Sequence, residues 1–385
     1  MAEATAGRPE LLRRLRDEIR ARGPMSFARF MDLALHDPEH GYYAQGARRL
    51  GRTGDFFTAS DVGSAFGSCL ARQIVEMDAL LGHPAPLRYI EHGAGRGLLA
   101  RDVLDALARR DPDVAARVEA TLVDASRGMR EAARAAAPEA RVVAPDELAP
   151  GGAGCVVAVE LLDALPVHRV RRRPGGLVEV KVALDGDRLV EVEGAPGDDV
   201  LAWGEAYGAA PELGDEAEVP LGLAGAVAAL AAGVERGFVL IVDYGHEARR
   251  LFGPAHNRGT LLAYHRHAAH EDYLARVGEQ DLTAHVNLTA LEREAVALGL
   301  APVGRVTQDR FLVANGILDD LPGEGDASPE ATQRRMQAKQ LLHPYGMGRV
   351  FQVAAFAKGI APAPVLRGLA DPFGASVGGE RTRPL

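Results

Sequence analysis

Short apolar runs alternate with amphipathic segments through the middle of the chain, a pattern typical of a parallel sheet wound with helices. The runs predicted as strands are residues 87–91, 120–124, 140–144, 155–160, 238–243 and 350–358. The segments with apolar residues at helical spacing are residues 98–109, 129–137, 221–233 and 289–298. Residues 155–160 are almost entirely apolar, as expected of a strand that is buried on both faces. We therefore predict an α/β fold with a Rossmann-like core.

The segments around this core have different patterns. Residues 9–22 are predicted as an amphipathic surface helix, and short charged strands around the turn Asp185-Gly186-Asp187 predict a hairpin appended to the core sheet. Residues beyond 359 are rich in Pro, Gly and Arg, which predicts a disordered tail. The predicted regions are an N-terminal helical region at 1–86, the first part of the core at 87–167, an insertion at 168–236, the second part of the core with a His-rich insertion at 237–359, and the tail at 360–385.

Net charge, the length of the apolar runs and the N-terminal segment argue against several classes of protein. The formal net charge of -9 argues against a nucleic-acid partner, and the basic residues 169–173 are interpreted as a solvated strand end. The sequence lacks an apolar run long enough for a membrane-spanning helix, so we expect no membrane partner. Residues 9–22 contain acids that a mitochondrial presequence would lack, and a cytoplasmic location is expected.

A metal site is not predicted from the sequence. The two cysteines, Cys69 and Cys155, do not form a CxxC pair, which leaves a zinc site or a disulfide framework unsupported. His265, His267 and His270 lie close together in the chain, but in a Gly-flanked loop that has no cysteine ligands.

The segment YIEHGAGRGLL at residues 89–99 carries the clearest chemical signal. An apolar strand ends in an acid and passes through Gly93, Gly95 and Gly97 into a helix. Glycines at these positions allow a sharp turn and a close approach of the backbone to a ligand. The first turn of the helix offers unpaired N–H groups to a carboxylate.

Nicotinamide and flavin enzymes use a related loop, and two details distinguish this one. The dinucleotide fingerprint GxGxxG would place its third glycine at position 98, which is Leu here. Glu91 precedes the first glycine by two residues, where a carboxylate would face the cationic ammonium and sulfonium groups of S-adenosylmethionine rather than a pyrophosphate. The predicted cofactor is therefore S-adenosyl-L-methionine.

Two further acids are predicted to bind this donor. Asp124 ends the second strand, where one carboxylate can accept hydrogen bonds from both ribose hydroxyls. Asp146 follows the third strand and is a candidate for the adenine amino group. The alternative for each acid is a purely structural role as a helix cap.

The reacting end is predicted at the carboxyl ends of the next strands. Glu160 ends the fourth strand and Asp163 follows it, and we predict both as catalytic residues that orient, neutralise or deprotonate an N–H or O–H acceptor. The alternative is that Glu160 caps the short helix after it. Asp243, Tyr244 and His246 end the fifth strand and are predicted to line the acceptor pocket.

Several blocks beyond the donor loop resemble the MidA-like family, which includes a mitochondrial arginine methyltransferase of complex I assembly. The blocks are HDPEHGYY at 36–43, TGDFFTAS at 53–60, ELLDALPVHR at 160–169, VDYGHE at 242–247, DLTAHVN at 281–287, TQDRFL at 307–312 and MGRVFQVAAFAKG at 347–359. The resemblance implies a class I methyltransferase core. It also implies that residues 53–60 form a lid over the donor, which brings Asp55, Thr58 and Ser60 near it.

The chain departs from the family pattern beside these acids. It has Val159, Leu161 and Leu162 around Glu160 where Asn-Glu-Phe-Phe is usual, Ala59-Ser60-Asp61 where Pro and Glu are usual after the TS pair, and His92 and Ala94 in the donor loop. Donor binding is therefore expected, while the acceptor cannot be copied from the mitochondrial member. The open alternatives are methylation of a protein side chain such as arginine, methylation of a small metabolite or modified peptide, and a non-catalytic assembly factor. The expected partners are a protein, peptide or small-molecule methyl acceptor and, as an assembly, a homodimer.

Overall fold

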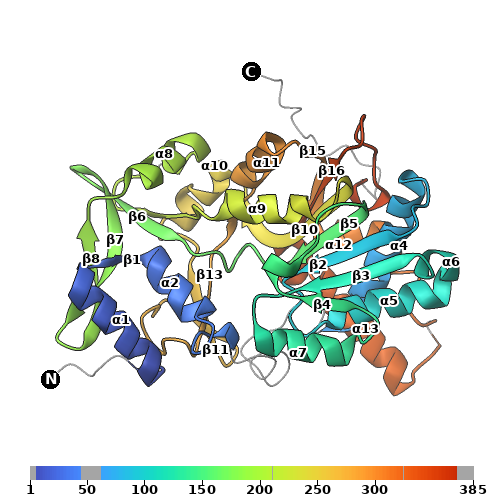
Figure 1. The fold of residues 1–385 in the computed structure, drawn as a ribbon, viewed down its shortest axis with the longest axis horizontal. Coiled ribbons are helices and arrows are strands. Elements are labelled where there is room, and N and C mark those ends of the chain that lie inside the picture. The colour runs from blue at the N-terminus through green and yellow to red at the C-terminus, as the bar shows by residue number, and fades with distance from the viewer. Residues whose placement is uncertain (1–5, 45–61, 210, 324, 371–385) are drawn as a thin grey trace.

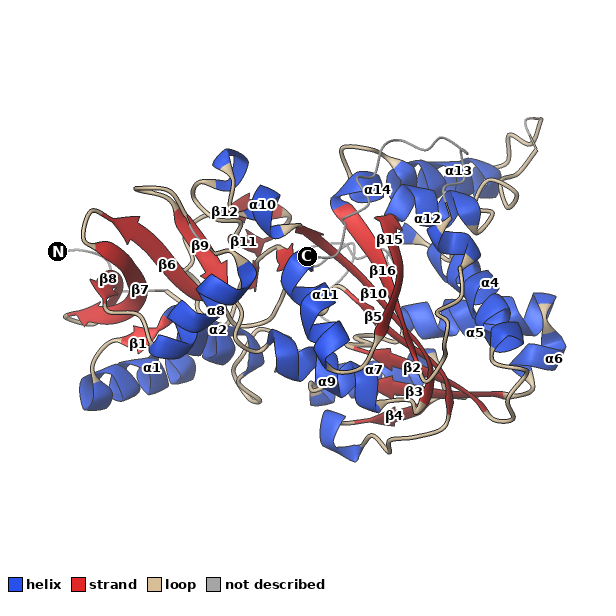
Figure 2. Cartoon of the chain, turned by 90° about the horizontal axis from the view of Figure 1, so that it is seen from above, coloured by secondary structure: helices blue, strands red, loops and turns tan. Residues whose placement is uncertain are grey.

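A twisted mixed sheet forms the centre of the larger lobe (Figures 1 and 2). The structure is a computed structural model that describes residues 6–44, 62–209, 211–323 and 325–370. The strands lie in the order β15-β16-β10-β5-β2-β3-β4, and β14 pairs with the end of β10. The strands from β10 to β4 are parallel, whereas β16 is antiparallel to both of its neighbours. The predicted Rossmann-like α/β core is confirmed.

Six strands of the larger sheet agree closely with the predicted apolar runs, whereas β14 and β15 were not predicted. Their bounds are β2 (Leu87–His92), β3 (Val118–Val123), β4 (Arg141–Val143), β5 (Ala153–Val159), β10 (Arg236–His246), β14 (Val286–Asn287), β15 (Ala301–Thr307) and β16 (Phe351–Lys358). β15 was not predicted, because most of its residues are only half-buried and the strand has no continuous apolar run.

Helices pack on both faces of this sheet (Figure 2). In β2 the period-two alternation of a strand directs Leu87 and Tyr89 into one core and Ile90 into the other. The first core includes α4 (Ala65–Leu80), α5 (Leu98–Arg110), α12 (Gln308–Ala314) and α13 (Pro329–Leu342), and the second includes α9 (Leu223–Ala232) and α11 (Leu288–Ala297). The remaining helical elements of this part of the chain are α6 (Pro112–Ala115), α7 (Arg127–Ala136), η2 (Pro145–Glu147), α8 (Asp198–Tyr207), α10 (Ala248–Leu251), η3 (Pro254–His256) and α14 (Met347–Val350).

The inserted strands build a second lobe instead of extending the core sheet. They form an antiparallel sheet of β1 (Met25–Ser26), β6 (His168–Arg173), β7 (Gly176–Asp185), β8 (Arg188–Gly194) and β9 (Glu216–Val219). This corrects the prediction of a hairpin appended to the core sheet. The apolar face of the second sheet, including Val182 and Leu189, is buried against α1 (Pro9–Arg22) and α2 (Phe27–His36), which cover it.

The predicted N-terminal region 1–86 is accordingly divided between the two lobes. α1 and α2 share a core with the inserted sheet, whereas α4 packs in the core of the larger lobe. A small third sheet of β11 (Leu262–His265), β12 (Ala268–His270) and β13 (Asp281–Thr283) contributes Ala263 and Leu282 to the core beneath α1 and α2.

Arg169 differs from the solvated strand end that the sequence predicts. It is buried, with 5% of its surface exposed, and forms ion pairs with Glu191 and Glu216. Its guanidinium lies 5.0 Å from the ring centre of Phe27 and 4.8 Å from that of Tyr273. Burial of this arginine is compensated because two carboxylates and two aromatic faces surround it.

The first part of the predicted disordered tail is ordered. Leu366 is fully buried, and η4 (Arg367–Leu369) packs on α4 and α12. The backbone N–H of Gly368 donates to Gln73 Oε1 at 3.0 Å, so residues in this segment complete the core. Residues 371–385 lie outside the described part of the chain. Within the described part, none of the helices is long and apolar enough to cross a membrane.

Candidate functional site

The turn from β2 into α5 is built by the glycines that the sequence singled out. Gly93, Gly95 and Gly97 have φ angles of 67°, 52° and 72°, in the left-handed region that favours glycine. A Cβ on Gly93 would lie 2.8 Å from Leu161 Cδ1, and no side chain caps the start of α5. The turn therefore leaves a backbone surface and the first N–H groups of the helix available to a ligand.

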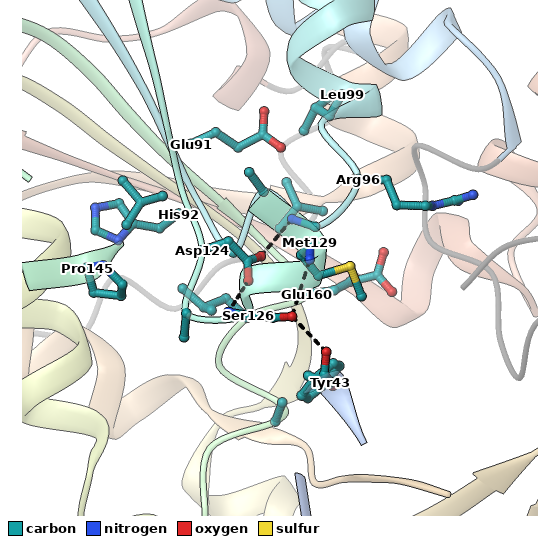
Figure 3. Close-up of a pocket in the computed structure, with 18 of the residues that line it drawn as sticks. Tyr43, Glu91, His92, Arg96, Leu99, Asp124, Ser126, Met129, Pro145 and Glu160 are labelled. Carbon is teal, nitrogen blue, oxygen red and sulfur yellow. Dashed lines mark hydrogen bonds between the residues drawn. The ribbon is translucent and has the colours of Figure 1, made fainter. Parts of the chain in front are cut away.

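A cavity of about 250 Å³ opens beside this turn (Figure 3). It is formed by the carboxyl ends of β2, β3 and β5 and closed on another side by His36, the last residue of α2, and Tyr43, which follows that helix. The lining combines acids with apolar side chains and comprises His36, Tyr43, Glu91, His92, Gly93, Ala94, Gly95, Arg96, Leu98, Leu99, Val123, Asp124, Ala125, Ser126, Met129, Pro145, Val159, Glu160, Leu161 and Ala164. Three of the predicted acids, Glu91, Asp124 and Glu160, thus meet at one cavity.

Glu91 is a buried acid at the end of β2. Only 4% of its surface is exposed, and Tyr89 donates its hydroxyl to Glu91 Oε2 at 2.8 Å. Burial raises the pKa of Glu91 to about 8, although the hydrogen bond from Tyr89 acts in the opposite direction. A carboxyl group held neutral in this way is poised to ionise when a cation enters the cavity.

Asp124 holds the glycine turn from the neighbouring strand. Its Oδ2 accepts from the N–H of Gly95 at 2.9 Å, and its Oδ1 accepts from the N–H of Ser126 at 2.8 Å. Burial raises the pKa of Asp124, and these two N–H groups oppose the shift. Each carboxylate oxygen retains a second lone pair, so the side chain can brace the loop and still accept from a ligand hydroxyl.

Asp146 and Gly97 are not among the residues that line the cavity. Asp146 lies in η2 with an exposed side chain, while its neighbour Pro145 does line the cavity. The acid that bonds to the backbone there is Glu147, which accepts from the N–H of Ala144 at 2.8 Å. Gly97 is the N-cap of α5 and packs on Ala133, so it shapes the helix start from outside the cavity.

Glu160 adopts an unusual backbone conformation directly after β5. Its φ angle is 53°, which is uncommon for a residue with a side chain, and its N–H donates to Val242 O at 2.9 Å. Such strain persists where the surrounding structure over-determines it, and it concentrates at functional sites. The side chain lines the same cavity as Met129 and Tyr43 (Figure 3).

Asp163, Asp243 and Tyr244 form a buried network behind the loop that carries Glu160. Asp243 Oδ2 accepts from the N–H groups of Leu162 at 2.8 Å and Asp163 at 3.3 Å, and the Tyr244 hydroxyl donates to Asp163 Oδ2. Burial raises the pKa of Asp163 to about 6 and that of Asp243 well above its ordinary value. The cavity lining does not include these three residues, and their contacts hold the loop after β5. Their predicted roles toward the acceptor stay predictions.

His246 also lies outside the cavity lining, in a group with His256 and His285. Asp55, Thr58 and Ser60, which the family resemblance places near the donor, lie outside the described residues. Their roles, and the lid, stay predictions.

Sequence reasoning missed the contribution of the segment after α2. The Tyr43 ring stacks on His36 with ring centres 5.5 Å apart, and its hydroxyl donates to Asp281 Oδ1 at 3.0 Å. Ser126 Oγ donates to the carbonyl of Tyr43 at 2.8 Å, which joins this segment to the donor loop side of the cavity. Tyr43 was noted in the sequence only as part of the HDPEHGYY block, which gave it no role at the cavity, and Ser126 drew no prediction.

The comparisons with known proteins agree with one another over most of the chain. A family model described as "Putative S-adenosyl-L-methionine-dependent methyltransferase" matches residues 69–306. The protein arginine methyltransferase NDUFAF7, mitochondrial, of Mus musculus is 28% identical over 90% of this chain and 84% of its own length. Its Drosophila melanogaster homolog is 28% identical over 94% of this chain and 88% of its own length. The crystal structure of a Burkholderia thailandensis protein bound to S-adenosyl-homocysteine has a TM-score of 0.84 and 31% identity, and covers 96% of this chain and 98% of that one.

The names of the curated relatives contradict the cytoplasmic location expected from the sequence, because they are mitochondrial proteins. The expectation rested on the acids in residues 9–22. In the structure these residues form α1, which buries Leu11 and Leu15 in the core of the smaller lobe. Because the helix is part of the fold, its pattern of charges reflects how it packs and does not indicate where in the cell the protein is located.

Proposed function

Because the chain belongs to the family of S-adenosyl-L-methionine-dependent methyltransferases, we propose that it methylates a protein side chain, with arginine as the acceptor. The methyl donor is S-adenosyl-L-methionine, and the resemblance drawn from the sequence blocks to the MidA-like family is confirmed. Arginine is chosen because the curated relatives that match over most of this chain are named protein arginine methyltransferases.

The residues at the cavity fit the donor chemically. S-adenosyl-L-methionine would supply an electrophilic methyl group on a sulfonium, together with ammonium, ribose and adenine groups. Glu91 would neutralise the cationic end, the positive-φ glycines would admit the donor against their backbone, and Asp124 would accept from the ribose hydroxyls. Leu99 and Met129 offer apolar walls. Asp146, with its exposed side chain, contributes least to this assignment.

Glu160 is proposed to act on the acceptor. The observation that carries this assignment is its strained backbone at the end of β5, which presents a further carboxylate at the cavity that Glu91 and Asp124 already line. A carboxylate can hold a guanidinium through two hydrogen bonds and thereby align one nitrogen for in-line attack on the methyl group. It can also accept the proton that the nitrogen loses. Asp163 would hold Glu160 in position through the network with Tyr244 and Asp243.

The acceptor class is tested by incubating the purified protein with isotopically methyl-labelled donor and a lysate of cells that lack its gene. Mass spectrometry then locates the label. We expect labelled arginine in a protein, absent when Glu160→Gln replaces the wild-type enzyme. Label in a small metabolite or modified peptide would replace the arginine proposal with the other acceptor class, and label on a different side chain would correct the residue type.

A further inference from the structure

Three histidines from separate segments converge at the end of β10. His246 is the last residue of β10, His256 ends η3, and His285 lies between β13 and β14. Each offers a ring nitrogen, and these nitrogens all lie within 4.8 Å of one another. The rings of His246 and His256 stack with centres 4.8 Å apart, and the His285 ring lies 5.3 Å from that of His246. The three are distinct from the sequence cluster at residues 265–270.

We propose that His246, His256 and His285 bind one divalent transition-metal ion, with Zn²⁺ as the best match, through three imidazole nitrogens. This departs from the expectation that the chain holds no metal. Imidazole is a preferred ligand for Zn²⁺, and three histidines with one position left for water is an established Zn²⁺ ligand set.

Two hydrogen-bonding features point to a ligand at this site. His256 Nδ1 lies 3.0 Å from the carbonyl of Arg250, a bond that orients the ring and leaves Nε2 available. Metal-binding histidines characteristically donate their second N–H to such a partner. His285 Nδ1 is buried and has no hydrogen-bond partner among the described residues, although a buried ring nitrogen normally finds one. A metal ion would satisfy it.

Burial favours the neutral form of two of the three rings. Burial lowers the pKa of His246 and of His285 to about 4, with further contributions from neighbouring positive charge. Imidazole binds a metal in its neutral form, which these two rings hold near neutral pH. The guanidinium of Arg250 adds to the lowering at His246 and is the unfavourable charge that the ion would have to tolerate.

The geometry requires only a local contraction. Nitrogens about 2.0–2.1 Å from a tetrahedral Zn²⁺ are about 3.4 Å apart, so the three rings must approach one another by up to about 1.4 Å from their present maximum separation. Side-chain rotations cover such a distance, and the three rings already contact one another. Binding would join the end of β10, which carries Tyr244, to η3 and the segment before β14, because Tyr244 also packs on His285 with ring centres 5.3 Å apart.

The experiment is a titration of chelator-treated, full-length protein without an affinity tag, using Zn²⁺ in calorimetry and Co²⁺ in visible spectroscopy. Wild-type protein should bind one Zn²⁺ per chain, and Co²⁺ should give the absorption of a tetrahedral site. His256→Gln and His285→Gln should each weaken binding at least about 100-fold. His343→Gln, which changes an exposed histidine at the end of α13, should leave binding unchanged.

A folding defect is separated from ligand loss by measuring S-adenosyl-L-methionine affinity and the thermal midpoint of each variant without metal. The proposal requires variants that fold and bind the donor as the wild type does, yet lose Zn²⁺ and the rise in thermal midpoint that Zn²⁺ produces. Wild-type protein without stoichiometric Zn²⁺ binding, or binding that survives in both His256→Gln and His285→Gln, would overturn it. If either variant is unfolded, His246→Asn decides the question in the same two measurements.

Discussion

At the scale of single residues, the site depends on acids whose ionisation is set by burial. Glu91 and Glu160 reach one cavity from neighbouring strands, yet their surroundings differ. Glu91 is buried beside the Tyr89 hydroxyl, whereas Glu160 is half-buried and follows its strand in a left-handed conformation. Different surroundings allow two carboxylates in one site to take different roles, one toward the donor and one toward the acceptor.

Glu91 makes donor binding depend on pH. Its pKa of about 8 means that the carboxyl group is largely neutral at lower pH, and a cationic donor favours the ionised form. Binding should therefore release a proton, and S-adenosyl-L-methionine affinity should rise by up to about tenfold per pH unit between about pH 6 and pH 7.5. Calorimetry in buffers of different ionisation enthalpy measures this release. Glu91→Gln should abolish it, while Glu119→Gln, on the exposed side of β3, should not. Equal proton release from the Glu91→Gln variant would contradict the assignment.

At the scale of elements, the donor loop could be predicted from the sequence because its chemistry is local. A strand, three glycines and the start of a helix follow one another within residues 87–99. The apolar runs also indicate where the first two strands of the core end. The rest of the cavity comes from distant segments. Tyr43 reaches it from the other lobe, and its approach depends on tertiary contacts with Ser126 and Asp281 that periodicity does not encode. The sequence likewise does not show that His256 lies beside His246 and His285, because the three residues belong to separate segments.

The glycine turn gives an element-scale prediction. Valine at position 95 would have to adopt a φ of 52°, which costs a β-branched residue more than the roughly 1–2 kcal/mol typical of left-handed backbone. Gly95→Val should therefore displace the backbone N–H of residue 95, which donates a hydrogen bond to Asp124. Donor binding should weaken at least about tenfold. Gly225→Val in α9 is the matched control, since a Cβ there meets nothing within 4 Å. Calorimetric titration with S-adenosyl-homocysteine compares them, and wild-type affinity in Gly95→Val would show that the turn does not contact the donor.

At the scale of the whole molecule, the chain forms two lobes with separate cores (Figure 1). Residues from both lobes line the cavity. The sequence indicated the larger lobe correctly because most of its strands contain an apolar run that is buried in the sheet. The smaller lobe was assigned as an insertion, since its strands show charge on the outer face and their partner helices lie more than a hundred residues earlier in the chain. Charged residues made this second sheet hard to predict from the sequence. One of them, Arg169, is buried between the inserted sheet and the rings of Phe27 and Tyr273.

Arg169 should therefore be a major source of stability for the smaller lobe. Arg169→Ala leaves Glu191 without its arginine partner, leaves Glu216 with Arg171 alone, and opens a space against Phe27. We therefore expect a loss of about 3 kcal/mol in the free energy of unfolding. Arg173→Ala removes an exposed ion pair with Glu193, which water and salt screen, and should change the stability far less. Urea unfolding followed by circular dichroism measures both. Similar losses for the two variants would mean that burial of Arg169 adds nothing.

The measurement that tests the central claim most directly is a paired determination of donor affinity and methyl-transfer rate for Glu160→Gln. The account assigns the donor to Glu91, Asp124 and the glycine turn, and the acceptor to Glu160. The variant keeps the side-chain shape and removes the charge, so the rate should fall by roughly 100-fold or more while affinity for S-adenosyl-L-methionine changes less than about twofold. A normal rate would reduce Glu160 to a structural residue, and parallel losses of rate and donor affinity would place it on the donor side of the cavity.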